Sequence, residues 1–148
     1  MNPTTLSSTG PSDRRIRWGR IAIGAILLEG VLLVVAVPLL LLVDSPFSAS
    51  ASSAEKEFTI FFVSVAFACF VVGTLAGWWV ARPLTSRFVL HGASTGIAAT
   101  AIYLGICSIP PSTIASAFAA YGAFWFLLAN GLRIVGSVLG AMYHGRGR

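Results

Sequence analysis

Residues 18–43 read WGRIAIGAILLEGVLLVVAVPLLLLV, an almost unbroken apolar run with one carboxylate, Glu29, inside it. A helix rises 1.5 Å per residue, so about 20 apolar residues cross the ~30 Å hydrocarbon core of a bilayer. The run is therefore long enough to span a membrane. An ionisable side chain at membrane depth is costly unless it is paired or hydrated. The stretch predicts a transmembrane helix whose carboxylate has a partner elsewhere in the chain.

Three further apolar stretches follow, at 58–81, 88–109 and 114–143. Of the 148 residues 56% are hydrophobic and only 10% are charged, whereas soluble domains are roughly 25% charged. We therefore predict an all-α, polytopic integral membrane protein with one four-helix transmembrane bundle over 14–148. The tail at 1–13 is rich in Ser, Thr and Pro, and we expect it to be disordered and cytoplasmic.

Positive charge collects on one side of the predicted bundle. The arginines that precede the first helix, join the second helix to the third and follow the fourth fall on the same side if the helices alternate: Arg14, Arg15, Arg17, Arg20, Arg82, Arg87, Arg146 and Arg148. The loop at 44–57 on the other side holds three acids and one lysine. The positive-inside rule then predicts the bacterial inner membrane with both termini in the cytoplasm. We interpret the arginines behind the net charge of +5 as topology signals and as contacts for anionic lipid head groups, and not as a nucleic-acid binding surface.

A cleavable signal peptide is the alternative for the first apolar run. Its arginines, its apolar segment and the small residues at 49–51 resemble the three regions of a signal peptide. A signal core, however, has roughly 7–15 residues, and the run at 18–43 is well beyond that length. We expect the first helix to stay in the mature protein.

Glycine pairs spaced four apart recur in three of the predicted helices, as Gly73 and Gly77, Gly92 and Gly96, and Gly136 and Gly140. In lipid, such pairs let helix backbones approach closely, either inside one bundle or in a homodimer. Internal packing is the interpretation that we prefer. The third helix also has small residues on a second face, which favours a position in the middle of the bundle.

The second and fourth predicted helices end alike, with VGTLAG at 72–77 and VGSVLG at 135–140. The same offset matches Phe61 with Phe124. A tandem duplication of a two-helix hairpin would produce this repeat, with a pseudo-two-fold axis along the membrane normal. Chance similarity between two apolar segments is the alternative.

The fourth predicted helix carries Asn130, Arg133 and Ser137 on one face, at i, i+3 and i+7. Apart from Glu29, Arg133 is the only ionisable residue deep inside an apolar run. Glu29 lies eleven residues beyond Trp18 and Arg133 lies eleven before His144, so each is about 16 Å from the inner interface at 1.5 Å per residue. Equal depth and opposite sign predict an ion pair, with Asn130 one turn away to satisfy the remaining hydrogen-bonding atoms.

A structural clamp is the preferred interpretation of this pair, and a polar site for an ion, proton or substrate is the alternative. The sequence has no nucleophile–base arrangement, phosphate loop or paired carboxylates, so we expect no enzyme activity, metal or cofactor. Cys69 and Cys107 lack C-x-x-C spacing and are interpreted as packing residues. The sequence thus predicts a structural or accessory subunit of a membrane complex or homo-oligomer. A small ion- or proton-coupled transporter or channel is the second class.

Two resemblances bear on this choice. The pattern Gly73-x-x-x-Gly77-Trp-Trp-Val-Ala-Arg82, followed by LHG at 90–92 and AIY at 101–103, resembles small, uncharacterised four-helix bacterial inner-membrane proteins and implies their topology. The segment GAILLE at 24–29 is similar to the first helix of small multidrug resistance transporters. In that family a membrane glutamate exchanges protons for cationic drugs, which implies that Glu29 is the coupling carboxylate. Those transporters place no arginine level with the glutamate, and Arg133 would repel a cationic substrate.

Overall fold

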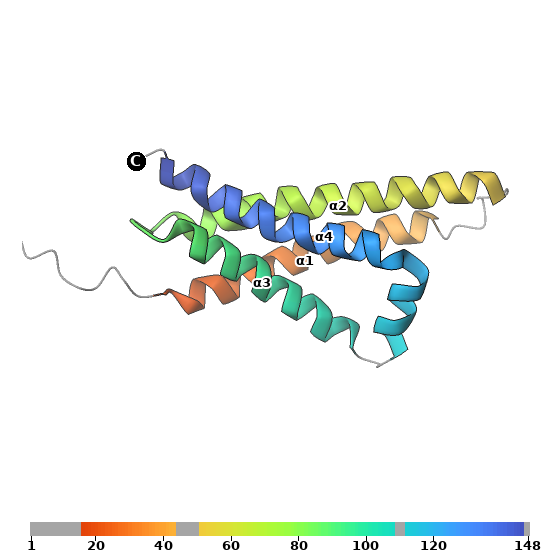
Figure 1. Cartoon of the computed structure of the whole chain (residues 1–148), viewed down its shortest axis with the longest axis horizontal. Coiled ribbons are helices and arrows are strands. Elements are labelled where there is room, and N and C mark those ends of the chain that lie inside the picture. The colour runs from red at the N-terminus through yellow and green to blue at the C-terminus, as the bar shows by residue number, and fades with distance from the viewer. Residues whose placement is uncertain (1–15, 44–50, 109–111, 147–148) are drawn as a thin grey trace, which may run out of the picture.

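The computed structural model describes residues 16–43, 51–108 and 112–146. The expected tail at 1–13, the first half of the loop at 44–57 and the proline turn after the third helix lie outside the described residues. Within them the chain is entirely helical, apart from short connections, and Figure 1 shows the four helices: α1 (Trp18–Val43), α2 (Ala51–Ala81), α3 (Phe88–Cys107) and α4 (Ser112–Arg146).

Each helix contains a segment long and apolar enough to cross a membrane: Trp18–Val35, Thr59–Ala81, Phe88–Cys107 and Ala123–Arg146. The prediction of an all-α chain with four helices of membrane-spanning length is confirmed. Many large apolar side chains, such as Val34 and Phe67, point outward and are exposed, while Glu29, Asn130 and Arg133 are buried. A bundle solvated by lipid is expected to show this distribution, because lipid tails are as apolar as the side chains that face them.

The helix bounds differ from the sequence prediction in three of the four helices. Helix α2 begins at Ala51 rather than at residue 58. The residues before the apolar run include Ala, Glu and Lys, which are strong helix formers. Helix α3 ends at Cys107 rather than at residue 109; a proline at 110 disfavours helical backbone in the residue before it. Helix α4 runs from Ser112 to Arg146 and so exceeds the predicted 114–143 at both ends.

The closest approach in the bundle joins α2 to α4, which run side by side in the same direction (Figure 1). The glycine pairs of both helices form this contact: Gly73, Gly77, Gly136 and Gly140. A Cβ atom added at Gly73 would lie 2.7 Å from the Arg133 carbonyl oxygen, and one added at Gly77 or Gly140 would overlap a carbonyl oxygen of the opposite helix. This is the close backbone packing that small residues permit in lipid.

The α2–α4 contact is reciprocal at the offset that aligns 72–77 with 135–140. The Thr74 hydroxyl donates to the Phe70 carbonyl oxygen at 2.8 Å. Ser137 and Arg133, the residues equivalent to Thr74 and Phe70, repeat this bond at 2.9 Å. These two bonds lie within their own helices. The contact between the helices is reciprocal as well, because Gly73 packs on the Arg133 carbonyl oxygen and the equivalent Gly136 packs on the Phe70 carbonyl oxygen. The two helices therefore pack with local two-fold symmetry.

Helix α3 contacts the other three helices, but only one of its two small faces is closely packed. Cβ atoms added at Gly92 and Gly96 would lie 2.5 Å from the Ser137 carbonyl oxygen and 2.7 Å from the Ile134 Cα of α4. On the second face Gly105 has no neighbour within 4 Å of its added Cβ. The second face is therefore open at Gly105, because helix α3 diverges from α1 towards its C-terminal end (Figure 1).

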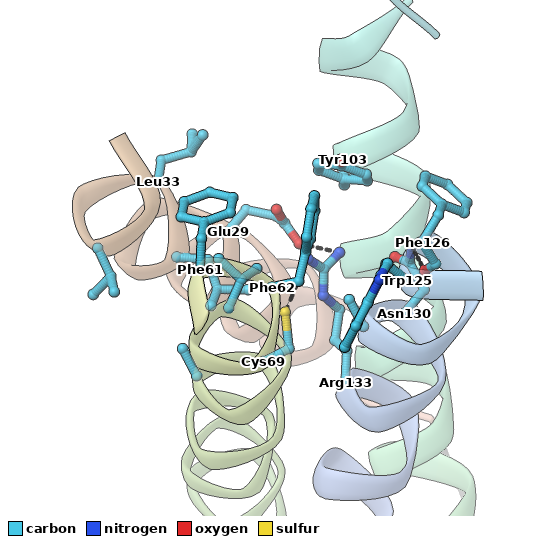
Figure 2. A pocket seen from close by; sticks show the side chains of 15 residues that line it. Glu29, Leu33, Phe61, Phe62, Cys69, Tyr103, Trp125, Phe126, Asn130 and Arg133 are labelled. Carbon is cyan, nitrogen blue, oxygen red and sulfur yellow. Dashed lines mark hydrogen bonds and ion pairs between the residues drawn. The ribbon is translucent and has the colours of Figure 1, made fainter. Parts of the chain in front are cut away.

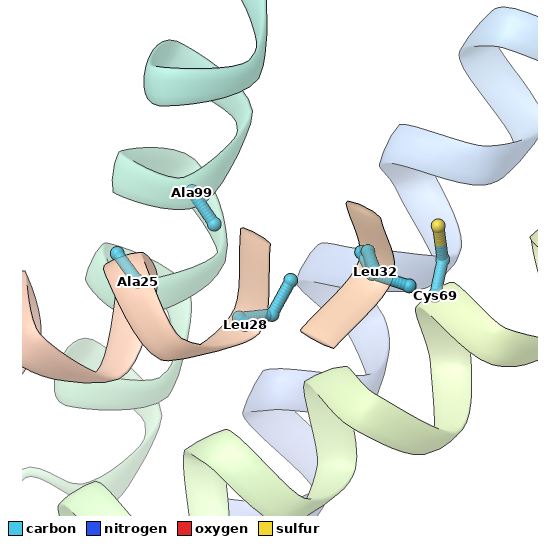
Figure 3. Close-up of a cluster of buried hydrophobic side chains, with 5 residues drawn as sticks. All are labelled: Ala25, Leu28, Leu32, Cys69 and Ala99. Atoms are coloured by element: carbon cyan, nitrogen blue, oxygen red, sulfur yellow. The ribbon is translucent and has the colours of Figure 1, made fainter. Parts of the chain in front are cut away.

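Helix α1 buries one face against α2 and α3. Figure 3 shows the resulting core cluster, formed by Ala25, Leu28, Leu32, Cys69 and Ala99. These side chains pack immediately beside Glu29, so they position the carboxylate on the inward face of α1.

Helix α1 starts, α2 joins α3 and α4 ends at the same end of the bundle (Figure 1), and arginine and tryptophan side chains are in contact there. Arg20 lies over the Trp79 ring at 4.4 Å and donates to the Trp79 carbonyl oxygen at 3.0 Å. Arg82 lies over the Trp78 ring at 3.9 Å. Such cation–π contacts hold the arginine side chains against the outside of the bundle.

Candidate functional site

An ion pair joins α1 to α4 in the interior of the bundle. Glu29 Oε1 lies 2.6 Å from Arg133 Nη1, and both side chains are at most 5% exposed. The structure thus contains the contact that the equal depth of the two residues predicts. Because both side chains are buried, either charge alone would be strongly disfavoured at this place.

The remaining contacts of Arg133 come from α2 and α3. Its Nη2 donates to Cys69 Sγ at 3.8 Å, and its Cζ lies 5.2 Å from the centre of the Tyr103 ring. Its backbone is held by the α2–α4 contact, since its carbonyl oxygen accepts the Ser137 hydroxyl and packs against Gly73. The close glycine packing therefore positions the guanidinium group.

A cavity of about 260 Å³ reaches the ion pair from between the four helices. Figure 2 shows its lining, which includes five aromatic side chains: Phe61, Phe62, Tyr103, Trp125 and Phe126. The polar residues lie at the end of the cavity nearer to the arginine-rich end of the bundle: Glu29, Cys69, Asn130 and Arg133. We call this space the aromatic cavity. It has one polar end, and its other walls are apolar.

The aromatic walls contact one another. The Phe62 and Trp125 rings are stacked, with centroids 5.5 Å apart and planes inclined by 19°. The Tyr103 and Phe126 rings lie 6.0 Å apart. Phe62 and Trp125 are equivalent at the offset that aligns α2 with α4, so this stacked pair continues the local two-fold symmetry of the two helices into the cavity.

Two buried polar atoms beside the cavity have no hydrogen-bond partner in the described part of the chain. The Asn130 Nδ2 donates to the Phe126 carbonyl oxygen at 2.8 Å, which leaves the Asn130 Oδ1 unpaired. The Arg133 Nε is likewise buried and unpaired. Leaving such an atom without a partner costs about 1–3 kcal/mol. Neither atom has accessible surface, so both lie behind the lining of the cavity rather than on it.

The structure brings together three of the four predicted polar site residues, Glu29, Asn130 and Arg133. Ser137 is fully buried, but it lies in the α2–α4 contact and does not line the cavity. The six predicted packing glycines are all in close contact with neighbouring helices, and none of them lines the cavity.

Sequence reasoning did not identify the aromatic walls or the role of Cys69 beside Arg133. One signal was available for the walls. The match of Phe61 with Phe124 extends by one residue to Phe62 and Trp125, and this second pair is the one that stacks. A repeat that conserves aromatic residues at one depth in two helices is a usable indication of an aromatic contact.

No metal centre is present among the described residues, because no three His, Cys, Asp or Glu side chains come close enough together. Comparisons of the chain with protein-family models, with curated proteins and with solved structures gave no match. The geometry of the site therefore has to carry the functional argument.

Proposed function

We propose that the chain is an integral protein of the bacterial inner membrane that binds a small molecule in the aromatic cavity, in the manner of a small coupled transporter. The observation that carries the proposal is a largely apolar cavity whose lining includes the buried Glu29–Arg133 pair and Asn130. Ligand sites are typically largely apolar, with a few convergent polar groups. An ionisable residue inside a membrane bundle is a functional candidate by default.

The proposed topology places both termini in the cytoplasm. Support comes from the arginine and tryptophan side chains at one end of the bundle, since basic residues favour the cytoplasmic side and tryptophan favours the interface. The arginines there would contact anionic lipid head groups. We also infer a tandem duplication of a two-helix hairpin, supported by the reciprocal α2–α4 glycine contacts.

A structural or accessory subunit of a membrane complex is the second candidate function, and the matched ion pair favours it. A clamp, however, needs no cavity beside it. The glycine pairs, which were candidates for a homodimer seam, are engaged inside the bundle. These two points favour ligand binding over a purely structural role.

Access to Cys69 tests the proposal. This thiol is 1% exposed but lines the cavity, so N-ethylmaleimide should modify it in a Cys107→Ser background. Ala129→Phe, which fills the cavity, should slow the reaction, whereas Ala101→Phe on an exposed position of α3 should not. Native mass spectrometry after incubation with a cell extract should then show a small-molecule adduct that Ala129→Phe lacks. An unreactive Cys69, or adducts unaffected by the filling substitution, would favour the structural role.

A further inference from the structure

The polar end of the aromatic cavity carries no net charge. Glu29 and Arg133 neutralise each other at 2.6 Å, and the amide of Asn130 is uncharged. A ligand ion would be attracted by one member of the pair and repelled by the other at a similar distance. It would also bring an uncompensated charge into an apolar site, which is strongly unfavourable. The balance favours an uncharged ligand.

The polar atoms at this end offer a ligand few hydrogen bonds. Glu29 Oε1, Asn130 Oδ1 and the Arg133 Nε and Nη1 atoms have almost no accessible surface. The Asn130 Nδ2 donates to the Phe126 carbonyl oxygen, and the Arg133 Nη2 donates to Cys69 Sγ. A strongly polar ligand would give up its hydrogen bonds to water here without replacing them, which is costly. The ligand is therefore expected to be apolar as well as uncharged.

The cavity opens sideways on α1. Leu33 and Val35 line it, yet they are 42% and 38% exposed, so the lining continues onto the outside of the bundle. Val35 lies six residues beyond Glu29, or about 9 Å farther from the arginine-rich end at 1.5 Å per residue. In the proposed topology the opening therefore lies in the outer half of the hydrocarbon core. Molecules dissolved in lipid reach such an opening directly, whereas charged groups are costly at this depth.

The walls indicate an aromatic molecule. Five aromatic side chains line the cavity (Figure 2), and aromatic rings favour offset-stacked or edge-to-face contacts with another ring. The cavity volume is about 260 Å³. An apolar cavity of roughly 150 Å³ binds benzene, and pockets for drug-sized ligands begin at roughly 300 Å³. The space therefore suits a molecule somewhat larger than benzene, such as two fused rings.

We propose that the aromatic cavity takes an uncharged, lipid-soluble aromatic molecule of up to two fused rings, which enters from the lipid beside Leu33 and Val35. The inference rests on the proposed binding function and adds to it the chemical class of the ligand and its route of entry. The absence of charge separates this class from the cationic drugs that the short similarity around Glu29 implies.

Brominated probes test the ligand class, because a bromine atom quenches tryptophan fluorescence on contact. Trp125 lines the cavity, whereas Trp18, Trp78 and Trp79 lie at the arginine-rich end of the bundle. The quenching that is lost in Trp125→Phe therefore reports the cavity. Bromonaphthalene is the neutral probe, bromonaphthoate the anion and bromonaphthylmethylammonium the cation. Bromodecane represents a flexible lipid chain with as many carbon atoms as naphthalene.

The probes are titrated against the full chain in detergent and compared at equal concentration in the detergent phase. Bromonaphthalene should quench Trp125 saturably and at the lowest concentration. The two ions and bromodecane should be weaker by about tenfold or more, because the ions bring an unpaired charge and the chain lacks ring contacts. Ala129→Phe, which fills the cavity, should abolish the saturable quenching, whereas the exposed Ala101→Phe on α3 should not.

The rate of quenching tests the route of entry. Val35→Phe narrows the opening and should slow the approach to the final quenching by bromonaphthalene. Val34→Phe is the matched control, because Val34 is exposed on the same helix but does not line the cavity. Equal rates in the two variants would overturn entry beside Val35.

Stronger quenching of Trp125 by an ion or by bromodecane would overturn the ligand class. If Ala129→Phe removed that quenching, the proposed binding function would stand with another ligand. Absence of saturable quenching by every probe would also overturn the class, and modification of Cys69 by N-ethylmaleimide that Ala129→Phe slows would then still support the binding function. An unreactive Cys69 together with unquenched Trp125 would overturn both proposals.

Discussion

Neutralising Glu29 and Arg133 together should destabilise the protein less than neutralising either residue alone. The two side chains meet at 2.6 Å and are at most 5% exposed. Glu29→Gln leaves an unpaired guanidinium in the bundle, and Arg133→Gln leaves an unpaired carboxylate. The double variant places two neutral amides at the same position, where they are able to hydrogen bond with each other.

The magnitude follows from the burial of the pair. Removing one partner of a buried ion pair typically costs about 3–5 kcal/mol, because the other charge is left without compensation. If each single substitution costs that much and the double variant costs no more than one of them, the coupling energy is about 3 kcal/mol or larger. Exposed ion pairs, by comparison, contribute roughly 0.2–1 kcal/mol.

The assay is a double-mutant cycle, with free energies of unfolding measured by denaturant titration in detergent. A second cycle combines Glu29→Gln with Arg20→Gln, which makes the same chemical change about 14 Å along α1 at 1.5 Å per residue. Distant sites are additive within roughly 0.3–0.5 kcal/mol, so this control cycle should show almost no coupling. Additivity in the Glu29–Arg133 cycle as well would refute the reasoning.

Three further predictions concern topology, packing and the arginine-rich end. A reporter active only in the periplasm should work when inserted within 48–53 and stay silent after Arg148, because the loop charges place these sites on opposite sides; the reverse pattern would overturn the orientation. Gly96→Leu should lower the thermal stability in detergent far more than Gly30→Leu, since an added Cβ meets the α4 backbone only at the former, and equal midpoints would contradict this. His91→Ala should lower the free energy of unfolding by about 2 kcal/mol in denaturant titration, because the two ring nitrogens of this buried residue bond to the Arg17 N–H and to the Arg87 carbonyl oxygen. An unchanged free energy of unfolding would show that these two bonds do not stabilise the protein.

Residue depth was predictable because the helical rise is fixed. Counting at 1.5 Å per residue places Glu29 and Arg133 level in the membrane, and the structure has them in contact. The helix bounds follow hydropathy at α1, differ slightly from the prediction at α3 and α4, and differ most at the start of α2. There the helix begins at Ala51, in polar residues that an apolar pattern does not include.

The cavity was not predictable, because it depends on how the helices diverge after they meet. Asn130 and Ser137 share one face of α4, but they are two turns apart, or about 10 Å along the axis. Ser137 lies where α2 and α4 touch through their glycines, and Asn130 lies where larger side chains separate the helices and leave the cavity. Periodicity in one helix assigns both residues to a face, whereas only the crossing of two helices decides which of them lines an open space.

The cavity has a polar end at only one side because the residues that line this end do not follow the local symmetry of α2 and α4. At the offset that pairs Phe62 with Trp125, Asn130 corresponds to Phe67, and Phe67 is 66% exposed on the outside of the bundle. Arg133 corresponds to Phe70. The stacked aromatic wall is thus shared by both helices, while the amide and guanidinium come from α4 alone and the carboxylate comes from α1.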